Sequence, residues 1–162
     1  MGEPFDLMIA FPPCTYLTVT GNIWFNVDLY GQKAIDRIFA RHDALGFVLR
    51  LYYSSVPRVA IENPVGYLSS GFRKPDQIIQ PYYFGNEFQK TTCLWLKGLP
   101  LLRHAKSRDL FTEEATWVDR GEMVTFGSGK TMPKWYADSR GDGHFRSRTF
   151  QGIANAMAEQ WG

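Results

Sequence analysis

The sequence has little cysteine and no long hydrophobic run, and these absences exclude several classes of protein. Its 162 residues include only two cysteines, Cys14 and Cys93. Two cysteines are too few for a disulfide framework, and we expect both to stay reduced in a cytosol. No segment approaches the roughly 18 continuous apolar residues that span a membrane. The N-terminus lacks a basic region followed by a hydrophobic core, so we expect no secretory signal, no membrane partner and a cytoplasmic protein.

Histidine is also scarce. The three histidines, His42, His104 and His144, have neither the mutual spacing nor the neighbouring cysteines of a zinc motif, so we expect no metal site. Residues 127–131 have the sequence Gly-Ser-Gly-Lys-Thr, as at the end of a phosphate-binding P-loop. Val124 stands where that motif requires glycine, and no strand–loop–helix pattern surrounds the run, so we reject this interpretation.

No strong excess of charge of either sign is present. The formal net charge is +2, which permits nucleic-acid binding without arguing for it. Basic residues from 103 to 148 are interleaved with Trp117, Trp135 and Tyr136. That pattern suits a nucleic-acid surface, and a solvated loop face explains it equally well. A hydrophobic fraction of 44% in a chain of this length predicts one compact domain over residues 1–162.

The most informative segment is residues 5–14, in which an apolar run ends in Pro12-Pro13 and Cys14 follows. Residues 5–11 are typical of a buried strand of a parallel sheet. Two prolines cannot continue the sheet because neither donates a backbone N–H. Cys14 should therefore lie just beyond the carboxyl end of a strand, where open α/β sheets place their chemistry. The alternative is a buried, inert cysteine.

A second motif of the same form lies downstream. Residues 59–61 are a short apolar run, and Glu62 and Asn63 follow it directly before Pro64. The proline disfavours helical backbone at Asn63, so the polar pair should also lie at a strand end. A thiol on one strand end and a carboxyl group on the next could attack a heterocyclic ring. The thiol would be the nucleophile, and the carboxyl group would hydrogen-bond or protonate the ring.

These motifs, in this order, resemble the catalytic motifs of the DNA cytosine-5 methyltransferases. Residues 84–92, followed by Cys93-Leu94-Trp95-Leu96, resemble that family's later glutamine/arginine motif and the strand after it. Residues 146–162 are similar to the C-terminal helix of short phage and prophage proteins described as cytosine methyltransferases. The resemblance implies a Rossmann-like α/β fold and a protein encoded by a phage or prophage. It also implies DNA as the partner.

The resemblance also assigns roles to residues. Cys14 would add to C6 of a cytosine flipped out of the helix, and Glu62 would hydrogen-bond its N3 edge. Asn63 would orient Glu62 or the loop that bears Cys14. The positions that match the family's substrate-binding motifs are Pro12, Pro13, Thr15, Gln89, Lys90 and Thr92.

The chain departs from the family at three places. Thr15 replaces the glutamine that follows the catalytic cysteine, and Lys90 and Thr92 stand near the places of the later motif's arginines. The resemblance implies S-adenosylmethionine as the cofactor, but the glycine-rich turn and acidic residue that bind this methyl donor have no counterpart before Phe5. We therefore expect the base-side portion of such an enzyme, with weak or no donor binding.

The remaining pattern predicts the order of the elements. Residues 32–53 show apolar residues at three- and four-residue spacing, which predicts an amphipathic helix. Residues 18–31 should form a loop, which either closes over the extruded base or docks its aromatic rings on the core. Residues 66–74 should be a loop or short helix, and residues 77–84 and 91–96 two strands of a hairpin. Within the single domain we expect residues 1–98 to be the α/β portion, 99–148 an irregular, target-recognition-like insert, and 149–162 a helix capped by Thr149.

Two other functions fit the same residues. One is a catalytically silent nucleotide- or DNA-binding module, such as a phage anti-defence factor. The other is a cysteine-dependent enzyme that acts on a nucleotide base without S-adenosylmethionine. If the donor-side strands are missing, residues 5–11 form an uncovered sheet edge, which invites pairing with another chain. We expect that edge to be covered by a second copy in a dimer, by a separate donor-binding subunit, or by a rearranged C-terminal helix.

Overall fold

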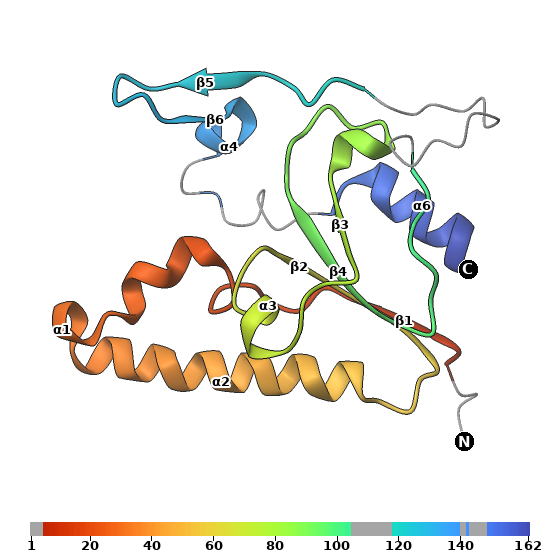
Figure 1. Ribbon diagram of the computed structural model, residues 1–162, viewed down its shortest axis with the longest axis horizontal. Coiled ribbons are helices and arrows are strands. Elements are labelled where there is room, and N and C mark those ends of the chain that lie inside the picture. The colour runs from red at the N-terminus through yellow and green to blue at the C-terminus, as the bar shows by residue number, and fades with distance from the viewer. Residues whose placement is uncertain (1–4, 105–117, 140–141, 143–148) are drawn as a thin grey trace. The chain divides into compact units, whose positions relative to one another are not determined.

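The computed structural model describes residues 5–104, 118–139, 142 and 149–162 (Figure 1). The chain divides into two compact units, of which the first comprises Met1–Ile78 and Thr92–Leu101. The second comprises Ile79–Thr91 and Leu102–Gly162. The chain is a mixed α/β protein with a four-stranded sheet, a two-stranded sheet and helices.

The larger sheet has the strand order β1-β2-β4-β3. Its strands are β1 (Leu7–Ala10), β2 (Arg58–Pro64), β3 (Gln77–Ile79) and β4 (Thr92–Lys97). β1 pairs with β2 in parallel, from Leu7 opposite Arg58 to Ala10 opposite Ile61. β2 pairs with β4 in antiparallel orientation. The end of β1 therefore lies beside β2, with Ala10 opposite Ile61. Glu62 and Asn63, predicted to follow the strand, instead lie within β2, because the strand continues to Pro64 through pairing with β4.

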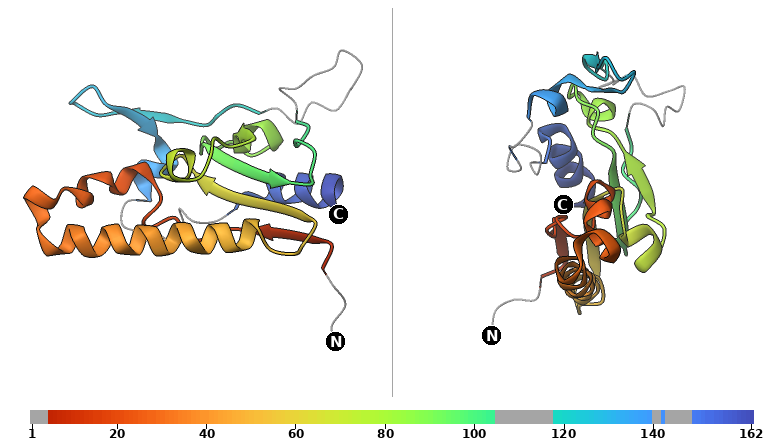
Figure 2. Two further views of the ribbon diagram at one scale, coloured as in Figure 1. Left: turned by 60° about the horizontal axis from the view of Figure 1, so that its bottom comes forward. Right: turned by 90° about the vertical axis from the view of Figure 1, so that its left-hand side faces the viewer.

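A long helix connects the two parallel strands. This helix, α2 (Gln32–Tyr52), runs beside the sheet in both side views (Figure 2), and it confirms the helix predicted for residues 32–53. Val48 of α2 belongs to a core cluster with Val59, Ile61 and Trp95 of the sheet. Leu68 of the short helix α3 (Leu68–Gly71) belongs to the same cluster. Residues 66–74 were predicted to be a loop or a short helix, and they contain a short helix.

Other boundaries differ from the predictions. The strand predicted for residues 5–11 is shorter, because β1 ends at Ala10. The strand predicted for residues 77–84 is wrong beyond Ile79, since a 3-10 helix, η2 (Pro81–Phe84), begins at a proline that cannot donate to a sheet. The predicted loop at 18–31 contains a 3-10 helix, η1 (Val19–Phe25), and a short helix, α1 (Val27–Tyr30). No residue of η1 is buried, so its aromatic rings do not enter the core.

The second unit contains a hairpin and the C-terminal helix. β5 (Met123–Thr125) and β6 (Thr131–Pro133) pair in antiparallel orientation and are followed by α4 (Lys134–Asp138). Residues 127–131 thus form a hairpin turn and the start of β6, which agrees with rejection of the P-loop interpretation. The helix predicted for residues 149–162 is α6 (Gln151–Trp161), in which Ile153, Met157 and Trp161 are buried. Thr149 is not the N-cap, however: Phe150 occupies that position and makes no side-chain cap.

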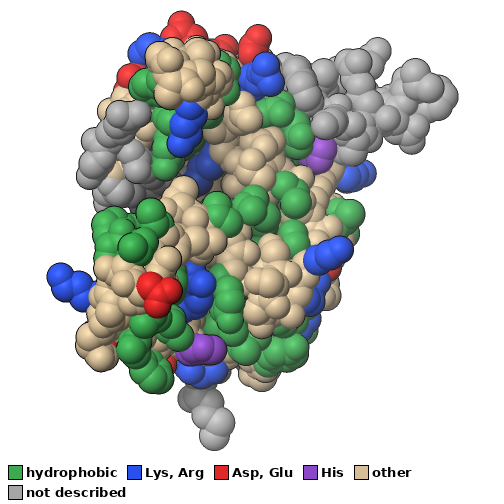
Figure 3. Space-filling model, turned by 60° about the vertical axis from the view of Figure 1, so that its left-hand side comes forward, with side chains coloured by type: hydrophobic (Ala, Val, Ile, Leu, Met, Phe, Trp, Pro, Cys, Tyr) green, Lys and Arg blue, Asp and Glu red, His purple; other side chains and the backbone are tan. Residues whose placement is uncertain are grey.

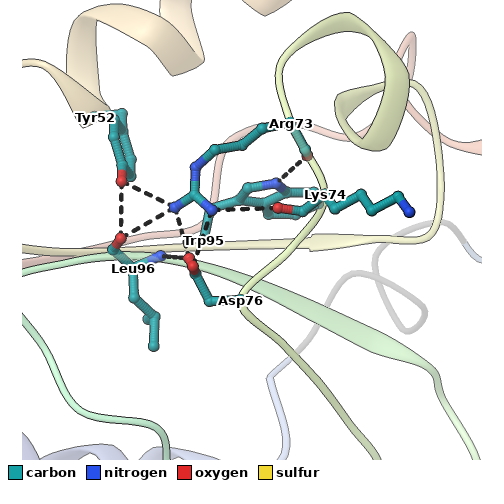
Figure 4. A network of polar contacts seen from close by, with 6 residues as sticks. All are labelled: Tyr52, Arg73, Lys74, Asp76, Trp95 and Leu96. Atoms are coloured by element: carbon teal, nitrogen blue, oxygen red, sulfur yellow. Dashed lines mark hydrogen bonds and ion pairs between the residues drawn. The ribbon is translucent and has the colours of Figure 1, made fainter.

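A polar network in the first unit ties the end of α2 to β4 (Figure 4). Two Arg73–Asp76 contacts, at 2.9 and 2.6 Å, form a bidentate ion pair. Arg73 also donates to the Tyr52 hydroxyl and to the Leu96 carbonyl, while Asp76 accepts from the Leu96 N–H at 2.6 Å. The Trp95 indole N–H donates to the Arg73 carbonyl. One ion pair therefore holds three separate segments of the chain.

This network predicts an acid-sensitive contribution to stability. Burial alone would raise the pKa of Asp76, but hydrogen bonds from Arg73 and from the Leu96 N–H outweigh it and lower that pKa. The stabilisation is complete above the usual aspartate pKa and is lost as the pH falls through the lowered pKa of the folded state. Asp76→Asn should cost roughly 1–2 kcal/mol at neutral pH, and the difference from wild type should shrink in strong acid. Urea unfolding at a series of pH values measures both.

The exposed ion pair Lys134–Asp138 provides the control. Asp138→Asn should leave unfolding almost unchanged at neutral pH, since exposed ion pairs contribute little. A loss for Asp76→Asn that stayed constant down to strong acid would contradict the assigned role of its carboxylate.

Candidate functional site

Cys14 lies on a tight turn that follows β1. Its carbonyl oxygen accepts hydrogen bonds from the Leu17 N–H at 2.9 Å and from the Thr18 N–H at 3.0 Å. Pro12 is buried, Pro13 and Thr15 are exposed, and the Cys14 side chain is half-buried. The prolines end the strand, and the turn at Cys14 presents the thiol beyond it.

Asn63 joins the two strand-end motifs. Its side chain is 1% exposed, and its Nδ2 donates a hydrogen bond of 2.9 Å to the carbonyl oxygen of Pro12. The proline carbonyl follows a strand that has just ended, so it has no sheet partner to satisfy it, and a buried carbonyl needs one. The asparagine therefore positions the loop that carries Cys14.

The loops after β1 and β2 also contact each other through their backbones. The Tyr67 N–H donates to the Leu17 carbonyl and the Val19 N–H donates to the Val65 carbonyl. Gly66 lies between these bonds, and a Cβ placed there would be 1.9 Å from the Leu17 oxygen. Only glycine allows this approach, because any side chain would overlap the opposite backbone.

Glu62 is half-buried on β2, opposite Leu94 of β4. Successive side chains of a strand point to opposite faces of the sheet. Ile61 belongs to the core cluster beneath α2, so Asn63 shares its face and Glu62 points to the other. The hydrogen bond to Pro12 is a contact with the Cys14 loop, which is one of the two roles predicted for Asn63.

Cys93 differs from Cys14 in both burial and acidity. It is 1% exposed, within the core cluster. Burial, with a smaller contribution from the charge of Glu62, raises the pKa of Cys93 to about 11. A thiol that remains protonated and buried is a poor nucleophile.

We therefore expect thiol reagents to modify Cys14 and to spare Cys93 in the native protein. Mass spectrometry after brief treatment with iodoacetamide near neutral pH should find one modified cysteine, in the peptide containing Cys14. The same treatment in denaturant should modify both and serves as the control. Preferential labelling of Cys93 in the native protein would contradict the assignment.

The other predicted substrate-binding residues fall in different parts of the chain. Thr92 is buried on β4 opposite Pro64, in the same unit as Cys14. Gln89 and Lys90 belong to the second unit. There the Gln89 carbonyl accepts a hydrogen bond from the Trp135 indole, and the Lys90 ammonium lies 5.8 Å from the centroid of the Phe150 ring.

A groove of about 460 Å³ lies next to the Cys14 turn. It is lined by Pro13, Thr15 and Tyr16 on the turn and by Ala40, Ala44 and Phe47 of α2, with Asp43 as its carboxylate. The lining is mostly apolar. Pro13 and Thr15, both predicted to bind substrate, therefore line this groove.

Sequence reasoning missed three residues near this turn. Gly66 permits the contact between the loops, while Arg37 and Arg41 of α2 hold the segment that follows Cys14. The Arg41 Nε donates to the Tyr16 carbonyl at 2.9 Å, and its Nη2 donates to the Asn22 side chain at 2.8 Å. The four-residue spacing of the two arginines was the available signal, because it places them on one helix face.

The structure adds two findings about the parts of the chain that it describes. In these ranges, no three His, Cys, Asp or Glu side chains converge as ligands for a metal ion. No helix there has both the length and the apolar character needed to cross a membrane. Comparisons of the chain with models of protein families, with curated proteins and with solved structures found no match.

Proposed function

We propose that the chain is the base-side portion of a DNA cytosine-5 methyltransferase with a Rossmann-like sheet, and that Cys14 is its nucleophile. The observation that carries this proposal is the hydrogen bond from Asn63 to Pro12. It joins the loop bearing the thiol to the part of β2 that bears Glu62, next to the end of the adjacent parallel strand β1.

The reaction begins with a cytosine flipped out of the DNA stack, because the ring carbon is inaccessible inside the helix. The Cys14 thiolate forms a bond to C6, and the C5–C6 double bond becomes an electron pair at C5. Glu62 hydrogen-bonds the N3 edge and stabilises the charge that develops there. In a complete enzyme, bound S-adenosylmethionine would supply the methyl group that C5 receives. Loss of the C5 proton then expels the thiolate.

This mechanism gives a test that needs no methyl donor. After Cys14 adds to C6, the electron pair at C5 can accept a deuteron from the solvent in place of a methyl group. Loss of the original C5 proton and departure of the thiolate then return a cytosine that carries deuterium at C5. Mass spectrometry of a cytosine-containing oligonucleotide incubated with the protein in deuterated water measures this exchange, after exchangeable N–H deuterium has been returned to hydrogen.

We expect exchange at C5 with the wild-type chain and none with Cys14→Ser, whereas Cys93→Ser should retain it. Glu62→Gln should slow exchange strongly, since it removes the carboxyl group that assists addition. Absence of exchange with a folded, DNA-binding wild-type chain would favour the silent binding module. Cysteine-dependent release of an altered base, without donor, would instead identify a different base-modifying enzyme.

S-adenosylmethionine binding is a separate expectation. The 162 residues show no recognised glycine-rich donor turn with an acidic ribose partner, so this chain on its own should bind the donor weakly or not at all. Isothermal titration calorimetry measures donor binding by the wild type and by Asp43→Asn, which removes the charge of the carboxylate in the groove. Tight one-to-one binding to the wild type that the variant loses would show that the groove takes the donor.

A further inference from the structure

Exposed residues of α2 at three- and four-residue spacing lie along one side of the helix. This outward face consists of Asp36, Phe39, Asp43, Phe47 and Arg50. Two of its members are aromatic: Phe39 is 66% exposed and Phe47 is 41% exposed. Figure 3, which brings the α1 end of the molecule forward, shows hydrophobic side chains at the surface among acidic and basic ones. Large apolar groups on an exposed face are typical of a surface that binds another protein.

The charges on the outward face are divided between its two halves. Asp36 and Asp43 come first and Arg50 comes last. Neither Asp43 nor Arg50 forms an ion pair with another described residue. The other arginines of α2, Arg37 and Arg41, are half-buried and lie over rings of the segment after Cys14. The outward face therefore runs from an acidic half to a basic half.

A face with this division is complementary to itself. When two copies of such a helix pack antiparallel, the acidic half of each lies against the basic half of the other. A two-fold axis then repeats every contact, as in most dimers of identical chains. Opposite charges across an interface favour association and fix its register.

The groove beside the Cys14 turn adjoins the outward face, because Asp43 and Phe47 line both. Its other wall includes Tyr16, its lining is mostly apolar, and Asp43 is the carboxylate in it. Arginine fits these features, since its methylene stem packs on apolar surface and its guanidinium pairs with carboxylates and stacks on aromatic rings. Arg50 of the same chain does not line the groove, so an arginine in the groove would come from another molecule.

We propose that α2 packs antiparallel on α2 of a second copy of the chain, with Arg50 of each copy in the groove of the other, against Asp43. A two-fold axis that passes between Gly46 and Phe47 places residue 43 of one copy level with residue 50 of the other. The two Phe47 rings then lie beside the axis and cover each other. The inference concerns association of the chain and does not rest on the proposed reaction.

The same register provides a partner for the remaining aromatic ring of the outward face. Phe39 lies level with residue 54 of the second copy, next to Tyr53. Tyr53 directly follows α2 and is 70% exposed. Aromatic and arginine side chains are enriched among the residues that dominate the binding energy of protein interfaces, and this packing buries both kinds.

Sedimentation velocity of the full chain at a series of concentrations tests the proposal. The wild type should show a reversible equilibrium between monomer and dimer. Asp43→Arg would place two arginines opposite each other at each contact, and Arg50→Asp would place two carboxylates there. Because like charges oppose association, each variant should raise the dissociation constant roughly tenfold or more. Circular dichroism should show that both variants stay folded, since both positions are exposed.

A mixture of the two variants distinguishes a contact between copies from one within the chain. In a mixed dimer, each substituted position again lies opposite a residue of the other sign. An equimolar mixture of Asp43→Arg and Arg50→Asp should therefore dimerise about as tightly as the wild type, although neither variant does so alone. Asp138→Arg is the matched control, because it makes the same change of net charge on α4, in the second unit. It should leave the dissociation constant within about twofold of wild type.

Three results would overturn the proposal. One is a wild type that stays monomeric at high concentration, and another is a mixture of the two variants that stays monomeric. The third is a dimer that withstands both charge reversals. In that case, amide hydrogen exchange that slows in β1 on dimerisation would assign the contact to the edge of the sheet instead.

Discussion

Gly66→Ala should destabilise the protein by about 3 kcal/mol and abolish C5 exchange, because the added methyl group would overlap the opposite loop. A Cβ at this position would be 1.9 Å from the Leu17 carbonyl oxygen and 2.8 Å from its carbon. Both contacts involve backbone, which cannot rotate away as a flexible side chain could. The loops after β1 and β2 would have to separate. Urea unfolding and the exchange assay measure the two consequences.

Gly46→Ala provides the matched control, since it makes the same chemical change in the middle of α2. A Cβ there would meet only the Arg50 Nη1, at an ordinary distance of 3.6 Å. Alanine favours helix over glycine by about 1 kcal/mol, so this variant should be slightly more stable than wild type and keep its exchange activity. Equal stability of the two variants would show that the loops move apart without cost.

Among nearly isosteric substitutions at the candidate site, we expect Asn63→Asp to lower the stability of the folded protein most. The wild-type amide donates to the Pro12 carbonyl, and its own Oδ1 is buried with no hydrogen-bond partner among the described residues. An aspartate would place a buried carboxylate against a carbonyl oxygen. We expect a loss of about 3 kcal/mol at neutral pH, as for an uncompensated buried charge, together with loss of exchange activity.

The pH dependence of this variant distinguishes charge from shape. Burial raises the pKa of a carboxyl group, and the protonated form could donate to Pro12 as the amide does. The loss of stability should therefore diminish as the pH falls. Asn26→Asp is the control: Asn26 caps α1 by accepting from the Leu29 N–H, and aspartate is an equally good cap. A loss for Asn63→Asp that does not vary with pH would implicate packing instead.

The sequence predicted the elements whose patterns are local. Helix α2 was predictable because its apolar residues recur with helical spacing, and β1 because its apolar run ends at two prolines. The apolar run of residues 59–61 indicated β2, but the strand continues through Glu62 and Asn63 to Pro64. The 3-10 helix at Pro81–Phe84 was missed because its aromatic residues have high strand propensity, although the proline that opens it cannot donate to a sheet. The N-cap at Thr149 was displaced by one residue, within the usual uncertainty of a helix end.

The candidate site was predictable only in part, for a physical reason. The prolines indicated that Cys14 and Asn63 follow strands. Cys14 does follow β1, whereas Asn63 is paired with Cys93 inside β2. Which groups they contact depends on the pairing of strands far apart in sequence, and no local pattern contains that pairing. The bond from Asn63 to Pro12 spans 51 positions. The need for glycine at position 66 likewise arises only when residue 17 lies against it.

The hydrogen bonds that close the turn at Cys14 determine how any experiment that replaces the Cys14 sulfur is interpreted. The hydrogen bonds that close the turn go to the carbonyl oxygen of Cys14, from the N–H groups of Leu17 and Thr18. No backbone bond of the turn uses the thiol. Serine at this position keeps the carbonyl and nearly the same volume. Cys14→Ser should therefore delete the reactive atom while leaving the loop folded, which makes an inactive Cys14→Ser protein evidence about chemistry rather than about structure.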